Sequence, residues 1–206
     1  MHALLSDEGQ AAIEAAIEAI ERRSAAEVVV SVHRRSGAYG GAKVVFGVLV
    51  AVAAQLFFLY SDVEFPLPLF VVGPLALGLL GAALGRVPLL ERLFAGPLRT
   101  RVQVRLAAEA AFYRHGVGHT RERTGVAVFI SLLERRVEVV ADSGVLRQRP
   151  IEPWEAAVAA LQAALARGGE VEAVTAALRQ LGDVLALCLP WRDGINELEN
   201  DVREDA

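Results

Sequence analysis

The stretch EVVVSVHRRSGAYGGAKVVFGVLVAVAAQLFFLY, residues 27–60, changes its character within a few residues. Its first part, Glu27 to His33, is a β-branched run typical of a buried strand. Its last part, Val44 to Tyr60, is a run of 17 residues without a charge. A strand of a folded domain therefore leads directly into a segment suited to lipid. This transition predicts a domain that is interrupted after its first strand.

A second uncharged run, FPLPLFVVGPLALGLLGAALG, covers the 21 residues from Phe65 to Gly85. A helix needs about 17–25 apolar residues to cross the hydrocarbon layer of a bilayer. Both runs reach this length, so the sequence predicts membrane spans at about 43–61 and 65–85. The alternative is a helical hairpin buried in a soluble core. It is disfavoured because a domain of this size rarely buries two helices that are apolar all round.

The composition agrees with a membrane protein. Hydrophobic residues make up 54% of the 206 residues, which exceeds the usual apolar share of about 45–50% in soluble domains. The net charge of -4 gives no basic footprint for nucleic acid, so no nucleic-acid partner is expected. The single cysteine, Cys188, permits no internal disulfide and agrees with a reducing compartment.

Basic residues flank the two apolar runs, whereas the loop between them is acidic. Because positively charged flanks remain on the cytoplasmic side of a membrane, both termini are expected in the cytoplasm and residues 61–64 on the far side. This topology is that of a bacterial inner-membrane protein with two spans. The residues concerned are Arg22, Arg23, Arg34, Arg35 and Lys43 before the runs, Asp62 and Glu64 in the loop, and Arg86, Arg92, Arg99, Arg101 and Arg105 after the runs.

The remaining segments predict helices and strands by their hydrophobic periodicity. A helix over 99–115 would place Val102, Leu106 and Ala110 on one face. The strands GVAVFISL and RRVEVVAD are expected to form a hairpin joined tightly at Leu133 and Glu134. The other predicted elements are a helix over 7–23, a strand over 27–33, a helix that begins at Pro153 and ends at Gly168, and a helix over about 170–188.

The central strands are apolar on both faces, and such strands are usually covered by helices on both sides. The sequence therefore predicts an α/β fold: a three-layer α/β/α sandwich around a small mixed sheet, interrupted by a two-helix transmembrane hairpin. The predicted organisation is a first part of the domain at 1–40, the hairpin insertion and return linker at 41–98, a second part of the domain at 99–190, and an acidic C-terminal tail at 191–206.

Four parts of the chain carry a resemblance to a known family. They are AAIEAIERRSAAEVVVSV, TRERTGVAVFISLLERRVEVVADSGV, Trp154 and LPWRDGINELENDV. In order and spacing they resemble the TPM domain family, in particular its bacterial membrane-protein branch, which has a two-span insertion after the first strand. A thylakoid acid phosphatase and a photosystem II repair protein belong to the same family. The chain departs from the family pattern at Ser24, Ala25 and Glu199.

The resemblance implies a candidate cation site formed by Glu27, Asp142, Asn196 and Asp201. Oxygen ligands from several segments suit a hard cation, since Ca²⁺ takes about 6–8 oxygens and Mg²⁺ about six. No cofactor is certain, and Ca²⁺ or Mg²⁺ are the ions that this set would accept. The alternative for each residue is a capping or strand-terminating role. Asp142, which precedes Ser143 and Gly144, is above all a turn signal.

Arg123 and Thr124 are a further candidate, because an arginine beside a strand start can bind a phosphate or carboxylate through two hydrogen bonds. The alternative is a surface ion pair of Arg123 with Glu122 or Glu138, and this structural role is favoured.

Other reactive residues have less support. His115 and His119 have the spacing of a helical zinc pair, but Gly116 and Gly118 disfavour a helix there. Ser131 lacks a nucleophile motif.

These observations predict a membrane-anchored TPM-domain protein whose cytoplasmic domain is an interaction or assembly module. The expected partners are the lipid bilayer and another membrane protein or a second copy of the chain. The alternative is a metal-assisted phosphatase. That chemistry needs several acidic ligands and a cationic group that converge on one point. Because the candidates in the sequence are scattered, a protein without enzymatic activity is favoured.

Overall fold

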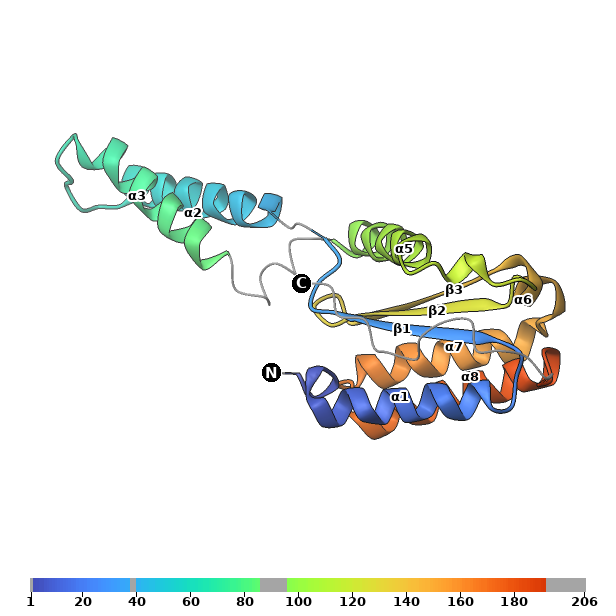
Figure 1. Cartoon of the computed structure of the whole chain (residues 1–206). Coiled ribbons are helices and arrows are strands. Elements are labelled where there is room, and N and C mark those ends of the chain that lie inside the picture. Colours follow the sequence, from blue (N-terminus) through green and yellow to red (C-terminus); the bar gives the residue numbers. More distant parts are fainter. Residues whose placement is uncertain (1, 38–39, 86–95, 192–206) are drawn as a thin grey trace. The chain divides into compact units, whose positions relative to one another are not determined.

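The computed structural model describes residues 2–37, 40–85 and 96–191 (Figure 1). The chain divides into two compact units, one formed by Met1–Ser36 with Arg101–Ala206 and the other by Gly37–Thr100. The elements in chain order are η1 (Ala3–Leu5), α1 (Asp7–Glu21), β1 (Glu27–His33), α2 (Gly40–Tyr60), α3 (Leu69–Leu84), α5 (Pro97–Arg114), η2 (Val117–His119), β2 (Gly125–Ser131), β3 (Arg136–Ala141), α6 (Ser143–Gln148), α7 (Ile151–Ala166) and α8 (Val171–Cys188).

The first unit is built on a three-stranded sheet in the order β1-β2-β3. Strand β1 is parallel to β2, in a register that runs from Glu27 opposite Gly125 to His33 opposite Ser131. Strand β3 is antiparallel to β2. The predicted α/β fold with a small mixed sheet is therefore confirmed, and strand β1 has the predicted bounds.

The connection between β2 and β3 differs from the predicted tight hairpin. Ser131 is opposite Arg136, so four residues connect the strands. The amides of Leu132 and Leu133 donate to the carbonyls of His33 and Arg34, and the amide of Arg135 donates to the carbonyl of Leu132 within the turn. The chain then turns back through Arg135, which has a φ of 50°. The predicted antiparallel hairpin of these two strands is therefore confirmed, but its connection is two residues longer than predicted, because periodicity could not include the hydrogen bonds to the segment at the end of β1.

One face of the sheet is covered by α1, α7 and α8, which lie together on the same side in Figure 1. Val28, Val30 and Val32 of β1 belong to the largest apolar cluster of the chain, together with the alternate residues of β2. From the helices this cluster includes Ile13 and Ile17 of α1, Trp154, Leu161 and Leu165 of α7, and Leu178, Leu181 and Leu185 of α8. The period of two in the strands and of about 3.6 in the helices places these side chains inside.

The opposite face of the sheet is covered by α5 (Figure 1). Val104, Ala108 and Ala111 of this helix pack around Phe129 of β2. Phe112 forms a smaller cluster with Val29 and with residues that follow α5. Helices therefore cover both faces of the sheet.

The second unit contains α2 and α3, which pack side by side as a helical hairpin. Helix α3 begins at Leu69, four residues later than the predicted span at 65. Pro66 and Pro68 explain the late start, because the residue before a proline is disfavoured in the α region. Over the described residues, one segment, Lys43–Tyr60, is long and apolar enough to cross a membrane by length and composition, whereas α3 is a shorter apolar helix.

We expect the first unit to fold without the helical hairpin, because all three strands and both apolar layers belong to it. A variant in which a short Gly/Ser linker replaces residues 41–98 should be water-soluble and should unfold in one sharp thermal transition followed by circular dichroism. The length of the linker has little effect on the free energy of folding, since each doubling of loop length raises the closure free energy by about 0.6 kcal/mol. An aggregated product without a cooperative transition would contradict this expectation.

Candidate functional site

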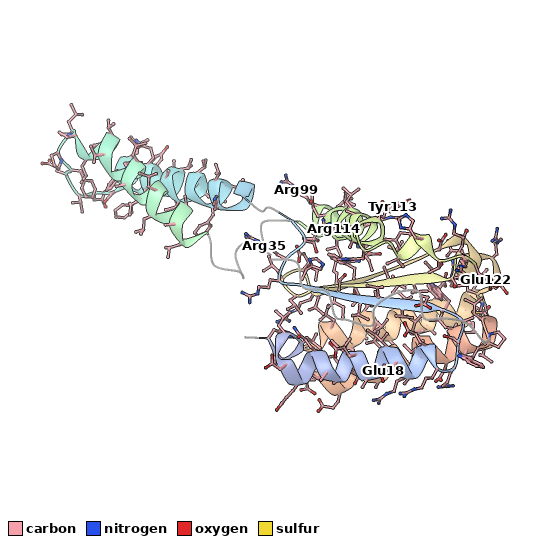
Figure 2. All side chains as sticks on the ribbon, viewed as in Figure 1. Glu18, Arg35, Arg99, Tyr113, Arg114 and Glu122 are labelled. Carbon is pink, nitrogen blue, oxygen red and sulfur yellow. The ribbon has the colours of Figure 1, made fainter. Side chains whose placement is uncertain are left out.

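The structure brings four of the candidate residues to one end of the sheet. Glu27 begins β1 opposite Gly125, which begins β2. Asp142 follows the end of β3, and its amide donates to the carbonyl of Gly125 at 2.9 Å. Arg123 and Thr124 precede β2 directly, next to Glu122, which is labelled at this end of the sheet in Figure 2. Glu27, Arg123, Thr124 and Asp142 therefore lie at the same end of the sheet.

Asp142 is held by two interactions. One carboxylate oxygen accepts a hydrogen bond from the amide of Ser143 and thereby caps α6. The other oxygen, Oδ2, lies 3.6 Å from Nη1 of Arg123, and only 11% of the Asp142 side chain is exposed. This oxygen is buried and makes no hydrogen bond. The guanidinium of Arg123 is therefore the positive charge that balances the buried end of Asp142.

Arg123 is placed for this role by an uncommon backbone conformation. Its φ is 58°, in the left-handed region, where a non-glycine residue carries a strain of roughly 1–3 kcal/mol. Its Nη1 donates to the carbonyl of Gly118 at 3.0 Å, and its own carbonyl accepts from the amide of Gly144 at 2.9 Å. A Cβ at Gly144 would lie 2.5 Å from that carbonyl oxygen, so the close approach depends on a glycine.

Thr124 contributes through its backbone. Its side chain is buried at 5% exposure. Its amide donates to Oγ1 of Thr120 at 2.9 Å, and its carbonyl accepts from the amide of Glu27 at 3.3 Å. These bonds fasten the loop before β2 to the start of β1.

The structure can be compared with the predicted cation site only in part. Asn196 and Asp201 lie outside the described residues. Over residues 2–37, 40–85 and 96–191, no group of three or more His, Cys, Asp or Glu side chains is arranged to hold a metal ion. In the described residues, the carboxylate of Asp142 pairs with the guanidinium of Arg123. This pair joins the loop before β2 to the turn after β3.

His115 and His119 do not share a helical face. Helix α5 ends at Arg114, and Gly116 adopts a φ of 68° in the left-handed region. His119 then belongs to the short 3-10 helix η2. The left-handed conformation of Gly116 interrupts the helical path between the two histidines, as the two glycines predict.

A second polar cluster, which the sequence did not reveal, lies at the opposite end of the sheet. Ser131 and Glu134 are both buried. The hydroxyl of Ser131 donates to Oε2 of Glu134, and the amide of Ser36 donates to Oε1 at 3.0 Å. His33, opposite Ser131 in the sheet, stacks on Phe129 with ring centroids 4.3 Å apart. Glu134 thus holds the chain where it leaves β1.

Cys188 is partly buried at the end of α8, where its thiol lies 3.6 Å from the carbonyl oxygen of Leu185. Burial raises the pKa of this thiol. The thiolate is the nucleophilic form of cysteine, so the raised pKa makes Cys188 a poor nucleophile at neutral pH.

The fold and the sheet-end clusters define an α/β domain with a small mixed sheet. Neither a family model nor a curated protein matches the sequence. Among solved structures, the chain is similar to the NMR structure of the BA42 protein from the psychrophilic bacterium Bizionia argentinensis, with a TM-score of 0.60 and 16% identity over 98% of this chain and 95% of that chain. At this identity the likeness shows the fold alone, and the resemblance to the TPM family stays a prediction.

We predict that Arg123→Met lowers the free energy of unfolding by about 1–3 kcal/mol, because it leaves the buried oxygen of Asp142 without a compensating charge. Adding Asp142→Asn should recover part of this loss, since asparagine retains the capping oxygen and removes the charge. Thermal unfolding of the four members of this double-mutant cycle in mild detergent measures the coupling. If Arg123→Met lowers the free energy of unfolding by the same amount in the unchanged protein and in the Asp142→Asn variant, the two side chains do not interact.

Glu134 provides a second stability test. Glu134→Ala removes the acceptor for Ser131 and for the amide of Ser36, and two unsatisfied groups at about 1–3 kcal/mol each should lower the melting temperature by several degrees. Glu134→Gln should cost less, because its amide oxygen can still accept and the hydroxyl of Ser131 can accept from its NH₂ group. Equal melting temperatures for Glu134→Ala and the unchanged protein would contradict the role of this carboxylate.

Proposed function

We propose that the chain is a membrane-anchored protein whose α/β domain is a cytoplasmic interaction or assembly module for other membrane proteins. The observation that carries this proposal is the inverted packing of α2 and α3. These helices expose their large apolar side chains and bury their small ones. In water this arrangement would leave an apolar surface unprotected, whereas in lipid it is the expected one.

The exposed side of the helical hairpin is apolar along its length. Leu79, for example, is 74% exposed. From Val44 to Tyr60 and from Phe65 to Gly85 the chain has no charged residue. The other large exposed residues of the hairpin helices are Val44, Val45, Val48, Leu49, Val52, Leu56, Phe57, Leu59, Tyr60, Val71, Val72, Leu75, Leu77, Leu80 and Leu84.

The contact between the two helices is made by small residues. A Cβ at Gly47 would lie 2.7 Å from the carbonyl oxygen of Gly78, and a Cβ at Gly78 would lie 2.9 Å from Cβ of Ala51. A Cβ at Gly81 would meet Val50 at 2.9 Å. Small residues spaced four apart let helix backbones approach closely in lipid, where van der Waals packing replaces the hydrophobic driving force.

The helix lengths suit a bilayer with the loop at one surface. Helix α2 has 21 residues and therefore extends over about 31 Å, close to the hydrocarbon thickness of about 30 Å. Helix α3 has 16 residues and extends over about 24 Å, so the apolar residues before it would complete the crossing. The loop with Asp62 and Glu64 would lie outside, in agreement with the basic residues that flank the hairpin.

The anchor also defines the partners that the domain can meet. A domain held at a membrane surface encounters other membrane proteins and other copies of the same chain at high local concentration. The second candidate, a metal-assisted phosphatase, has less support because the guanidinium of Arg123 is already engaged by Gly118 and Asp142. We therefore favour an assembly role over catalysis.

The topology can be tested by thiol labelling of intact cells. In a Cys188→Ala background, Ser61→Cys should react with a membrane-impermeant maleimide added outside, and Ser143→Cys should not. Both positions should react after lysis, which controls for accessibility. Ser61 is in the loop between the helices and Ser143 is exposed in the α/β domain. Labelling of Ser143→Cys but not of Ser61→Cys in intact cells would overturn the proposed orientation.

A further inference from the structure

Helix α5 has two apolar faces, and only one of them packs on the sheet. Val104 and Ala108 are fully buried against β2. Val102, Leu106 and Tyr113 are exposed to 50%, 54% and 77%. At 100° per residue, these three residues lie on the side of the helix opposite to the buried one. Figure 2 shows Tyr113 on the side of α5 that faces away from the sheet. We call the exposed set, with Ala110, the outer stripe.

The outer stripe is bordered by positive charge. Arg105 and Arg99 are exposed, and at 100° per residue Arg105 lies along one side of the stripe and Arg99 along the other. Over Pro97–Arg114, four arginines against one glutamate give a net charge of +3, in a chain whose total is -4. The one acidic residue, Glu109, is already paired with Arg105 at 3.0 Å. Helix α5 is therefore a basic segment in an acidic protein.

Chain length limits how far α5 can start from the end of α3. Thirteen positions separate Leu84, the end of α3, from Pro97, the start of α5. At no more than about 3.3–3.6 Å per residue, this distance is at most about 45 Å. If α3 ends at the membrane surface, as proposed above, α5 starts within that distance of the surface.

We propose that the outer stripe of α5 lies on the cytoplasmic membrane surface, with its apolar side chains at the boundary of the acyl chains and its arginines on anionic phospholipid head groups. The inference rests on the proposed membrane anchor. A helix with an apolar face bordered by arginines binds in the interface by apolar burial and by attraction to anionic lipid. A lipid surface fits better than a protein partner, because the charge border complements anionic head groups and the tether brings the helix to them.

The experiment uses the full chain, in a Cys188→Ala background, reconstituted into phosphatidylcholine vesicles with or without phosphatidylserine. An environment-sensitive fluorophore is attached to Leu106→Cys, to Leu79→Cys in the hairpin, or to Ala176→Cys on the exposed side of α8. Quenchers on the lipid acyl chains report contact with the bilayer. We expect the Leu79 reporter to be quenched in both lipids, the Leu106 reporter several-fold more with phosphatidylserine than without, and the Ala176 reporter in neither.

The charge border is tested by matched double variants. Arg99→Gln with Arg105→Gln should reduce quenching of the Leu106 reporter several-fold. Arg167→Gln with Arg179→Gln, an equal change in charge at exposed positions just after α7 and on α8, should leave it unchanged. Equal losses for both double variants would overturn a specific role of the α5 arginines.

The outcomes distinguish the inference from the proposed function. If the Leu79 reporter is quenched but the Leu106 reporter is not, the membrane anchor is supported and the α5 inference is overturned. If the Leu79 reporter is not quenched either, the anchor itself fails. A Leu106 reporter whose emission shifts to the blue without lipid quenching, and in proportion to protein density, would assign the outer stripe to a contact between copies of the chain and overturn the lipid inference.

Discussion

The parallel pairing of β1 with β2 is the interaction on which the rest of the structure depends. It joins residues 27–33 to residues 125–131, so the segment between the two paired strands contains the entire helical hairpin and α5. Parallel strands require a crossover connection, usually a helix that covers one face of the sheet. Here the crossover contains α5, which covers the sheet, and in addition a helical hairpin that belongs to a second unit. An insertion at this point leaves the strand register intact.

The two units place apolar residues by opposite rules. In the first unit the large side chains are inside: Phe129, Leu161 and Leu181 are almost completely buried. In the second unit the buried positions include Gly73 and Gly81, whereas leucines and valines are outside. Both rules apply within 206 residues, and the second rule is the one expected of helices surrounded by lipid. This contrast supports the membrane proposal more directly than hydropathy does, because it concerns which side chains pack and not only how many are apolar.

The helices and strands of the first unit could be predicted where a single hydrophobic pattern, of strand or of helix, runs through the segment. Strand β1 has four valines among its seven residues, and its predicted bounds match those observed. The outer stripe of α5 could not be assigned, because Val102 and Leu106 have the same spacing as Val104 and Ala108, and periodicity does not tell which of two apolar stripes meets the sheet. Helix α6 was missed because its six residues are too short for a periodic signal.

The grouping of Glu27, Thr124 and Asp142 follows from the order of the strands, whereas the contacts of these residues do not follow from the sequence. Glu27, Thr124 and Asp142 flank strands in the sequence, and the register then brings them to one sheet end. The pairing of Arg123 with Asp142 depends on a left-handed residue, which no propensity favours at an arginine.

At the other sheet end nothing in the sequence indicates a polar cluster, because Glu134 is predicted only as part of the join between two strands. Its burial has a structural consequence. Glu134 binds the backbone of Ser36, the last residue of the first unit before the hairpin, so the exit of the chain from β1 is held by a carboxylate that belongs to the α/β domain itself.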